Sequence, residues 1–392
     1  MTDAAARLDH LERLGLRRGL VPVEPRGALA LVEGREVVSF CSNDYLGLAD
    51  HPAVKAGAIA AVERWGCGSG SSRLVAGDFP LLAEAEAELA AFVGFEAALL
   101  VGSGFAANLG LMASLPTAGE RLHSDALNHA SIIDGCRLSR AEVRVLPHGD
   151  VDAATRAFAE APGGWYVAES LYSMDGDTPD LGALLTAASA AGVRVAVDEA
   201  HALGILGPEG RGLAWGARAA TGLAPEVLVG TFGKALGSFG AFITCSAATR
   251  ELLINVARPV VFSTAPAPAT VGAALAALRL IQGDGGPREA LLARSAQLRR
   301  ALTQLGYDLR GCTAHIVPVV VGSPEGALAL SAGLLEDGIF ARAIRPPTVP
   351  PGTSRLRLTV SALHTPAQIE ALVEAVDRRC RALRIGPHGE GR

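Results

Sequence analysis

The sequence predicts an α/β fold, with a large domain built on a mainly parallel sheet and a smaller α+β domain towards the carboxyl terminus. Three observations carry this prediction. Short apolar runs alternate with longer helical patterns, the runs end in small or polar residues, and the pattern changes after about residue 280. Strands that alternate with helices are typical of parallel sheets. Ligands of such sheets bind outside the carboxyl ends of the strands, where polar residues cluster in this sequence.

The elements of the large domain follow from hydrophobic periodicity. Helical patterns cover 79–94 and 181–192. The apolar runs that predict strands are 97–104, 165–170, 193–200 and 226–233.

The remaining segments predict an amino-terminal arm and a second domain. A helical pattern and a stretch with a turn signal at Glu33-Gly34 precede the large domain. A helical pattern at 287–306 and apolar runs at 314–322 and 355–364 follow it. We therefore expect an arm over 1–46, a large domain over 47–280 and a small domain over 281–392.

Composition indicates a compact soluble protein that acts on small molecules. Of 392 residues, 49% are hydrophobic and 19% are charged, which is far from the composition of disordered chains. The net charge of -5 provides no broad basic surface for nucleic acid or an anionic membrane. Six isolated cysteines favour neither a metal cluster nor a disulfide framework, and the amino terminus has no export signal. We expect a cytoplasmic protein without a bound metal.

A glycine-rich turn at 100–108 is the first candidate site. Gly102, Gly104 and Ala107 match G-x-G-x-x-[GA] between an expected strand and an expected helix, where backbone N–H groups can bind a phosphate. The phosphate could belong to a dinucleotide, with Asp125 holding its ribose, or stand alone. A plain turn from strand to helix fits the same pattern.

Carboxylates and imidazoles follow the expected strands. Asp198 ends the strand pattern at 193–200, and His201 comes three residues later. A buried carboxylate needs a partner, so Asp198 could pair with a ring nitrogen, although it could equally cap a helix. His129 lies among small residues in DALNHASIIDG, and Glu169 and Ser173 lie in ESLYSMDGD. Each of these has an alternative explanation as a structural histidine or a polar loop.

Lys234 is the single charge in the stretch VGTFGKALGSFG, residues 229–240. The stretch is not a P-loop, because Leu228 replaces the first glycine and Ala235 replaces the hydroxyl that binds magnesium. Taken alone, the pattern also fits a surface lysine on a glycine-rich loop.

Taken in order, these features resemble pyridoxal-phosphate (PLP) enzymes of fold type I, which have the aspartate-aminotransferase-like fold. Over residues 18 to 370, eight stretches in the same order resemble the α-oxoamine synthase family. They are FCSNDYLGLADHP, GSGSSRLVAGDFPLLAEAEAELA, SGFAAN, LNHASIIDG, SLYSMDGD, VDEAHALGILGPEGRG, TFGKALGSFGA and RPPTVPPGTSRLRLT.

The resemblance implies roles for individual residues. Lys234 would bind the aldehyde of PLP and later remove the Cα proton of the substrate, because a lysine among small residues is easily desolvated. Asp198 would pair with the ring nitrogen, and His129 would stack on the ring face. The remaining cofactor contacts would be His201 and Ser173 at the ring oxygen, and Gly104, Phe105, Thr231 and, from a second subunit, Ser263 or Thr264 at the phosphate.

The resemblance also implies the substrates and a homodimer. Arg357 would bind the amino-acid carboxylate, with Arg355 as its rival on the same strand face, because a guanidinium fits a carboxylate in two parallel bonds. Further substrate contacts would be Arg18, Asn43, Tyr45 and Thr348. The stretch AIRPPTVPPGTSRLRLT is most similar to family members that join L-alanine to a pimeloyl thioester, on coenzyme A or a carrier protein, in biotin biosynthesis.

Other functions remain open from the residues alone. A sister enzyme such as glycine C-acetyltransferase would use glycine or serine with another acyl-CoA. An NAD-dependent dehydrogenase would use the glycine turn and Asp125, but it would leave Lys234 and Asp198 without roles. A non-catalytic scaffold would leave every motif without a role.

Overall fold

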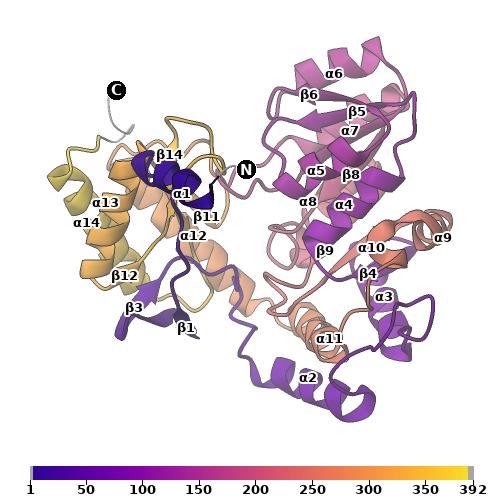
Figure 1. Ribbon diagram of the computed structural model, residues 1–392, viewed down its shortest axis with the longest axis horizontal. Coiled ribbons are helices and arrows are strands. Elements are labelled where there is room, and N and C mark those ends of the chain that lie inside the picture. The colour runs from indigo at the N-terminus through magenta and orange to yellow at the C-terminus, as the bar shows by residue number, and fades with distance from the viewer. Residues whose placement is uncertain (1–2, 387–392) are drawn as a thin grey trace. The chain divides into compact units, whose positions relative to one another are not determined.

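The computed structural model describes residues 3–386. The chain forms two compact units (Figure 1). The larger unit comprises residues 48–172 and 178–288, and the smaller unit comprises residues 3–47, 173–177 and 289–386. The domain limits at residues 46 and 280 stay a prediction. Among residues 3–386, no helix is long and apolar enough to cross a membrane.

A seven-stranded sheet forms the centre of the larger unit. Its order is β4-β10-β9-β8-β7-β5-β6, and β10 alone runs antiparallel to its neighbours, so the predicted mainly parallel sheet is confirmed. The strands are β4 (Ala97–Val101), β5 (Arg121–Asp125), β6 (Glu142–Leu146), β7 (Trp165–Glu169), β8 (Arg194–Asp198), β9 (Val227–Thr231) and β10 (Ala241–Cys245). Strands β7, β9 and β10 are buried along their whole length, as expected of parallel sheets covered on both faces.

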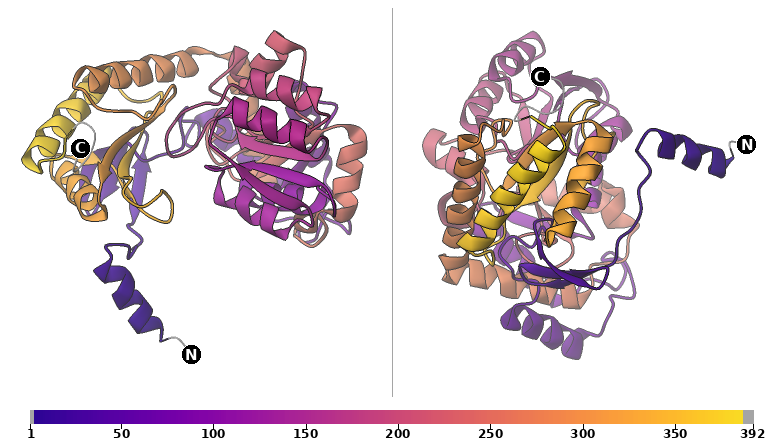
Figure 2. Two further views of the ribbon diagram at one scale, coloured as in Figure 1. Left: turned by 90° about the horizontal axis from the view of Figure 1, so that it is seen from above. Right: turned by 90° about the vertical axis from the view of Figure 1, so that its left-hand side faces the viewer.

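Helices cover both faces of this sheet (Figure 2). Helices α4, α5, α9 and α10 pack against one another, as do α6, α7 and α8. The helices of the larger unit are α2 (Pro52–Trp65), α3 (Pro80–Val93), α4 (Gly104–Ser114), α5 (Ala130–Leu138), α6 (Val151–Glu160), α7 (Leu181–Ala190), α8 (Leu213–Thr221), α9 (Ala247–Val256), α10 (Arg258–Val261) and α11 (Pro268–Gly283).

Three neighbouring strands end in polar residues at the same edge of the sheet. Glu169 ends β7 and pairs in register with Asp198, which ends β8, and Thr231 ends β9. Parallel strands bring their carboxyl ends to one edge, so residues far apart in the sequence meet there.

The smaller unit contains two sheets. One has the order β1-β2-β3-β12, and the other, antiparallel, has the order β11-β14-β13. The predicted turn at Glu33-Gly34 joins β2 to β3, and both residues have positive φ, as a tight hairpin turn requires. The strands are β1 (Val23–Arg26), β2 (Leu29–Val32), β3 (Arg35–Ser39), β11 (Ile316–Gly322), β12 (Ile339–Phe340), β13 (Ala343–Ile344) and β14 (Ser354–Thr359).

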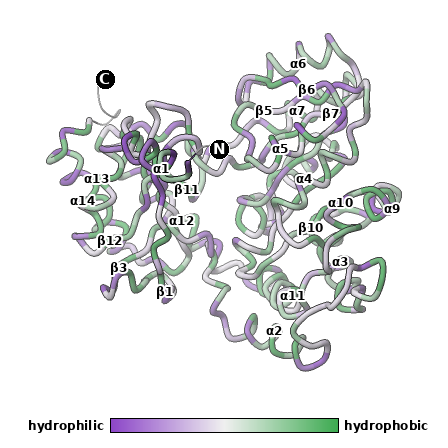
Figure 3. The backbone as a smooth tube through the Cα atoms, viewed as in Figure 1, coloured by the Kyte–Doolittle hydropathy of each residue, from purple (hydrophilic) through white to green (hydrophobic). Residues whose placement is uncertain are grey.

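Four helices complete this part of the chain, and the first of them is unusual. They are α1 (Ala4–Arg13), α12 (Gly286–Gln304), α13 (Pro324–Glu336) and α14 (Pro366–Ala382). Helix α1 buries none of its residues and is largely hydrophilic (Figure 3). Leu8 and Leu11 nevertheless lie one helical turn apart and are exposed.

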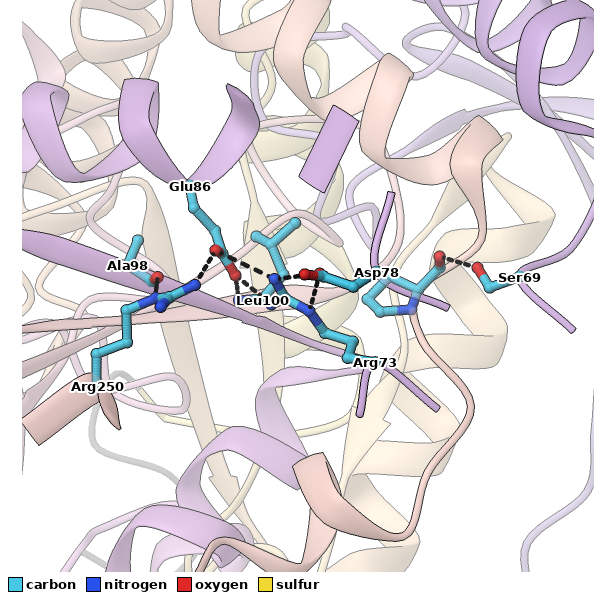
Figure 4. A network of polar contacts seen from close by, with 8 residues as sticks. Ser69, Arg73, Asp78, Glu86, Ala98, Leu100 and Arg250 are labelled. Atoms are coloured by element: carbon cyan, nitrogen blue, oxygen red, sulfur yellow. Dashed lines mark hydrogen bonds and ion pairs between the residues drawn. The ribbon is translucent and has the colours of Figure 1, made fainter. Parts of the chain in front are cut away.

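A buried carboxylate on α3 anchors the loop that precedes this helix (Figure 4). Glu86 accepts hydrogen bonds from the backbone N–H of Leu100 at 2.8 Å and from Arg250 at 2.7 Å. It also forms an ion pair with Arg73, which in turn binds Asp78 at 2.7 Å. Both side chains of the Glu86–Arg73 pair are at least nine-tenths buried, so each buried charge is stabilised by the other.

We predict that Glu86→Ala lowers the free energy of unfolding by about 3–5 kcal/mol, the usual loss when one partner of a buried ion pair is removed. Urea unfolding followed by circular dichroism measures the change. The control is Glu84→Ala on the same helix, whose side chain is 52% exposed and binds Arg279. This change should cost less than about 1 kcal/mol. Equal losses in the two variants would contradict the role given to Glu86.

Candidate functional site

The amino terminus of α4 forms a site suited to a phosphate. Ser103 caps the helix by accepting from the N–H of Ala106 at 3.1 Å, which leaves the first N–H groups of the helix, at Gly104 and Phe105, for another acceptor. A Cβ atom on Gly104 would lie 3.8 Å from the side chain of Thr231. The helix terminus and Thr231 therefore lie next to each other. The Thr231 hydroxyl donates to the carbonyl of Gly240 at 3.0 Å, so it has to rotate to bind the same anion as the helix terminus.

Asp198 is held at the end of β8 by two neutral groups. Its Oδ1 accepts from the N–H of Ala200 at 2.7 Å, and its Oδ2 accepts from Asn108 Nδ2 at 2.6 Å. The bond to Ala200 closes a local turn after the strand, so the alternative of a helix cap is wrong. Asp198 is only 7% exposed, and the cavity described below lies beside its carboxylate.

The next residue, Glu199, points to the opposite side, as alternate residues of a strand do. Its carboxylate accepts from the N–H groups of Leu213 at 3.1 Å and Ala214 at the start of α8. Burial raises the pKa of Glu199 to about 7. Glu199 therefore fixes a helix, whereas Asp198 faces the cavity.

His129 is the cap residue of α5. Its Nδ1 accepts from the N–H of Ser131 at 3.2 Å and lies 2.7 Å from the Ser131 hydroxyl. The preceding residue, Asn128, is buried and donates to Ser124 Oγ at 2.9 Å and to the carbonyl of Val167 at 2.8 Å. Asn128 thus holds the turn that presents His129. Burial lowers the pKa of His129, and the nearby Lys234 adds to this effect, while Asp198 opposes it.

Lys234 lies beside His201. The distance from Lys234 Nζ to His201 Nε2 is 2.7 Å. A hydrogen bond between two nitrogens needs a lone pair on one of them, so Lys234 and His201 can exchange a proton. The chain contains two lysines, Lys234 and Lys55, and Lys55 lies on α2 with its side chain 54% exposed.

These groups surround a cavity of about 180 Å³ in the larger unit. Seven of the residues predicted from the sequence line it: Gly104, Phe105, His129, Asp198, His201, Thr231 and Lys234. Four lining residues were not predicted: Asn108, Ser131, Glu169 as a cavity residue, and Ala200. Asn108 lies one helical turn after Gly104, so the position of the glycine turn could have indicated it.

Glu169 introduces a second carboxyl group beside Asp198. Its side chain is buried, and Oε1 accepts no hydrogen bond. Burial raises the pKa of Glu169 to about 8, and the neighbouring Asp198 carboxylate acts in the same direction. Burial and the neighbouring Asp198 carboxylate therefore both favour the protonated form of Glu169.

In the smaller unit, Arg357 lies with three other predicted residues. Its guanidinium donates to Asn43 Oδ1 at 3.1 Å, to the Tyr45 hydroxyl at 3.3 Å and to the carbonyl of Ser173. All of these acceptors are neutral. Arg18 and Thr348 also lie together, with Arg18 Nη2 3.4 Å from Thr348 Oγ1.

Arg355 differs from Arg357 although both lie on β14. Arg355 is 1% exposed and forms an ion pair with Asp175, and it also donates to the carbonyl of Thr353 at 2.9 Å. Its charge is therefore neutralised within the chain, which argues against Arg355 as the carboxylate-binding residue.

Asp125 cannot hold a ribose, because its buried carboxylate accepts from the N–H groups of Leu127 at 2.8 Å and Gly149 at 2.9 Å and binds His148 at 2.8 Å. Ser263 and Thr264 are exposed and do not line the cavity.

Two curated proteins similar to this chain have the same name. The 8-amino-7-oxononanoate synthase of Geobacter sulfurreducens is 46% identical over 387 residues, which cover 97% of this chain and 98% of the relative. The synthase of Anaeromyxobacter dehalogenans strain 2CP-1 is 47% identical over 376 residues, which cover 95% of this chain and 94% of the relative.

Solved structures have the same fold. A serine palmitoyltransferase variant from S. paucimobilis with a bound PLP–myriocin aldimine matches with a TM-score of 0.91 and 30% identity, over 97% of both chains. An 8-amino-7-oxononanoate synthase from Francisella tularensis matches with a TM-score of 0.77 and 26% identity, over 89% of this chain and 99% of that one. The sequence pattern of the class I and II aminotransferases matches residues 35–376. The chain therefore belongs to the class I and II aminotransferase family.

Proposed function

We propose that the protein is a PLP-dependent 8-amino-7-oxononanoate synthase. It would join L-alanine to a pimeloyl thioester and release carbon dioxide and the free thiol, a step of biotin biosynthesis. The observation that carries the proposal is Lys234, which lies 2.7 Å from His201 in a cavity that also holds Asp198 and the amino terminus of α4. The relatives named for this activity, which match almost the whole chain at 46–47% identity, support the choice of substrates.

The cavity residues fit PLP group by group. Gly104, Phe105 and Thr231 would hold the phosphate, and Lys234 would bind the aldehyde. Asp198 would face the ring nitrogen and favour its protonated form, which needs the anionic carboxylate that Asn108 and Ala200 stabilise. His129 would lie on the ring face, and His201 would contact the ring oxygen. Ser173, which was predicted for the same contact, belongs to the smaller unit and does not line the cavity. When bound, PLP supplies a ring that withdraws electrons from the Cα of an attached amino acid.

The side chains of the protein would then move one proton. Lys234 takes the proton from the substrate Cα and later returns it. His201, hydrogen-bonded to Nζ, can accept a proton from Lys234 and leave it with the lone pair that a base needs. Because the pKa of Glu169 is raised, its neutral form adds no second negative charge beside the ring nitrogen that would pair with Asp198.

Arg357 would bind the carboxylate of alanine. Its partners Asn43, Tyr45 and Ser173 are neutral, so its charge is not matched by any of them. The planar guanidinium is held in place and can form two parallel bonds to a carboxylate. Arg18 and Thr348 would contact the acyl substrate.

A second copy of the chain would complete the site. The exposure of Ser263 and Thr264 is consistent with contacts to a partner, and their predicted role is to hold the phosphate of the neighbouring subunit. The exposed Leu8 and Leu11 of α1 form an apolar strip that a second copy could cover. A cytoplasmic homodimer is therefore part of the proposal.

The main alternative is another α-oxoamine synthase, such as glycine C-acetyltransferase. The fold similarity to serine palmitoyltransferase favours the wider group and does not separate its members. The dehydrogenase alternative has lost its ribose-binding residue, because Asp125 is committed to Leu127, Gly149 and His148.

We predict that Lys234→Ala lowers turnover by at least about 10³-fold, because both the covalent bond and the general base are lost. PLP should still bind through its phosphate and ring contacts, which absorbance after gel filtration measures. The matched control is Lys55→Ala, which should leave turnover unchanged. Borohydride reduction of the wild-type protein should attach the cofactor to the peptide that contains Lys234, and near-native turnover in Lys234→Ala would exclude the proposal.

We predict that Arg357→Lys weakens alanine binding by about 1.5–3 kcal/mol, the scale of hydrogen bonds to charged groups. This corresponds to a roughly 10- to 150-fold higher Kd in a spectral titration. Cofactor absorbance should be unchanged. Arg355→Lys is the comparison. It should lower the thermal stability of the protein and have a smaller effect than Arg357→Lys on the Kd for alanine. The assignment is wrong if the two variants show the reverse pattern.

Substrate preference tests the proposal against its sister activities. We expect L-alanine with a pimeloyl thioester to have a higher kcat/KM than glycine with acetyl-CoA or L-serine with palmitoyl-CoA. Thiol release measures each pair with the CoA thioesters, and pimeloyl-carrier protein serves as a second acyl donor. A higher value for glycine with acetyl-CoA would replace the synthase by glycine C-acetyltransferase and leave the role of Lys234 intact.

A further inference from the structure

We propose that Asn108 and Ser131 are positioning residues that fix His129 as a neutral imidazole with its proton on Nε2, while Asn108 holds the Asp198 carboxylate. The inference rests on the proposed function, because it gives the side chain expected on the cofactor ring a defined charge. It depends on four residues from three different elements: Asn108 on α4, His129 and Ser131 at the start of α5, and Asp198 on β8.

The backbone determines which nitrogen of His129 carries no proton. The N–H of Ser131 points at His129 Nδ1 from 3.2 Å. A backbone N–H can only donate, so Nδ1 must accept with its lone pair. A neutral ring with a lone pair on Nδ1 carries its proton on Nε2.

The Ser131 hydroxyl extends this constraint. Its Oγ lies 2.7 Å from the same Nδ1, and on an Nδ1 without a proton the hydroxyl donates to the lone pair that the N–H of Ser131 shares. The hydroxyl oxygen in turn accepts from Asn108 Nδ2 at 3.0 Å. Ser131 is 0% exposed, so water does not compete for either bond.

Asn108 sets the direction of the whole chain of hydrogen bonds. Its second Nδ2 hydrogen goes to Asp198 Oδ2 at 2.6 Å. The amide cannot turn over, because its carbonyl oxygen would then face a carboxylate. Two hydrogens on one nitrogen therefore meet two acceptors, and the bonds run from Asn108 to Asp198 on one side and through Ser131 to His129 on the other.

The charges around His129 have opposing effects on the protonation of its ring. The amino terminus of α5 and Lys234 disfavour an imidazolium, and Asp198 favours it. Glu169, which faces His129 from β7, is neutral near pH 7 because burial raises its pKa to about 8. Protonation of Nδ1 would also break the bonds from the N–H and the hydroxyl of Ser131, so the neutral ring is the stable form.

A neutral ring matters for the cofactor that it would cover. Asp198 is expected to keep the ring nitrogen protonated, and an imidazolium stacked on that ring would place two cations face to face. Because the hydrogen bonds keep His129 neutral, the negative charge of Asp198 would pair with the ring nitrogen of the cofactor and not with His129.

The test is a long-range ¹H–¹⁵N spectrum of cofactor-free protein labelled in its nine histidines. His129→Gln identifies the signal. In the wild type we expect the pattern of an Nε2–H tautomer, with a His129 titration midpoint below the ordinary value near 6.5. A wild-type Nδ1–H pattern, or a midpoint at the ordinary value or above, overturns the proposal without any variant having to fold.

Variants test the two positioning residues separately. Ser131→Ala and Asn108→Leu should each raise the midpoint of His129 by about one pH unit or more, whereas Ser131→Thr keeps the hydroxyl and should restore the wild-type value. The control is Ser139→Ala, which removes a hydroxyl that binds the carbonyl of Cys136 at the other end of α5. A shift in Ser139→Ala as large as that in Ser131→Ala would show a merely structural effect. These spectra do not involve PLP, so their outcome is independent of the borohydride experiment on Lys234.

Discussion

The buried carboxylate of Asp198 is the constraint on which the rest of the site depends. A carboxylate that is 7% exposed would be costly without partners, and its two oxygens are held by Ala200 and Asn108. Both partners are neutral, so the charge is stabilised and not cancelled. Every other group of the cavity is arranged around that charge. Burial and Asp198 raise the pKa of Glu169, Nδ1 of His129 accepts from the start of α5, and Lys234 lies beside His201.

The parallel sheet explains why such different residues meet. Glu169, Asp198 and Thr231 end three consecutive strands in the sheet, although 62 positions separate the first from the last in the sequence. The helix that follows β4 adds its amino terminus at the same edge, next to Thr231. Positive charge from the helix terminus and negative charge from Asp198 thus both contribute to the lining of one cavity. A molecule that carries a phosphate and a basic ring nitrogen matches these two charges.

The sequence predicted the parts of the site that have local signatures. Strand patterns located Asp198 and Thr231, a glycine turn located the start of α4, and an isolated lysine located Lys234. The glycine turn could have indicated the position of Asn108 but not its hydrogen bond to Ser131, because that bond joins α4 to α5 and neither segment reveals its partner. Glu169 was seen in a polar stretch, but its neutral state depends on its register with Asp198, which only the paired strands reveal. The ribose hypothesis for Asp125 was wrong for the same reason, since Gly149 and His148, which bind its carboxylate, are more than twenty residues away.

The two arginines of β14 show how a partner decides the role of a side chain. Residues two apart on a strand share one face, so periodicity treats Arg355 and Arg357 alike. Asp175 makes the two arginines different, because its carboxylate binds Arg355. The acceptors that bind Arg357 are an amide oxygen, a hydroxyl and a backbone carbonyl. These neutral acceptors orient the guanidinium and leave its charge for a carboxylate from outside the chain. A buried, matched arginine stabilises the fold, whereas an oriented, unmatched one can bind substrate, and only the position of one aspartate distinguishes the two.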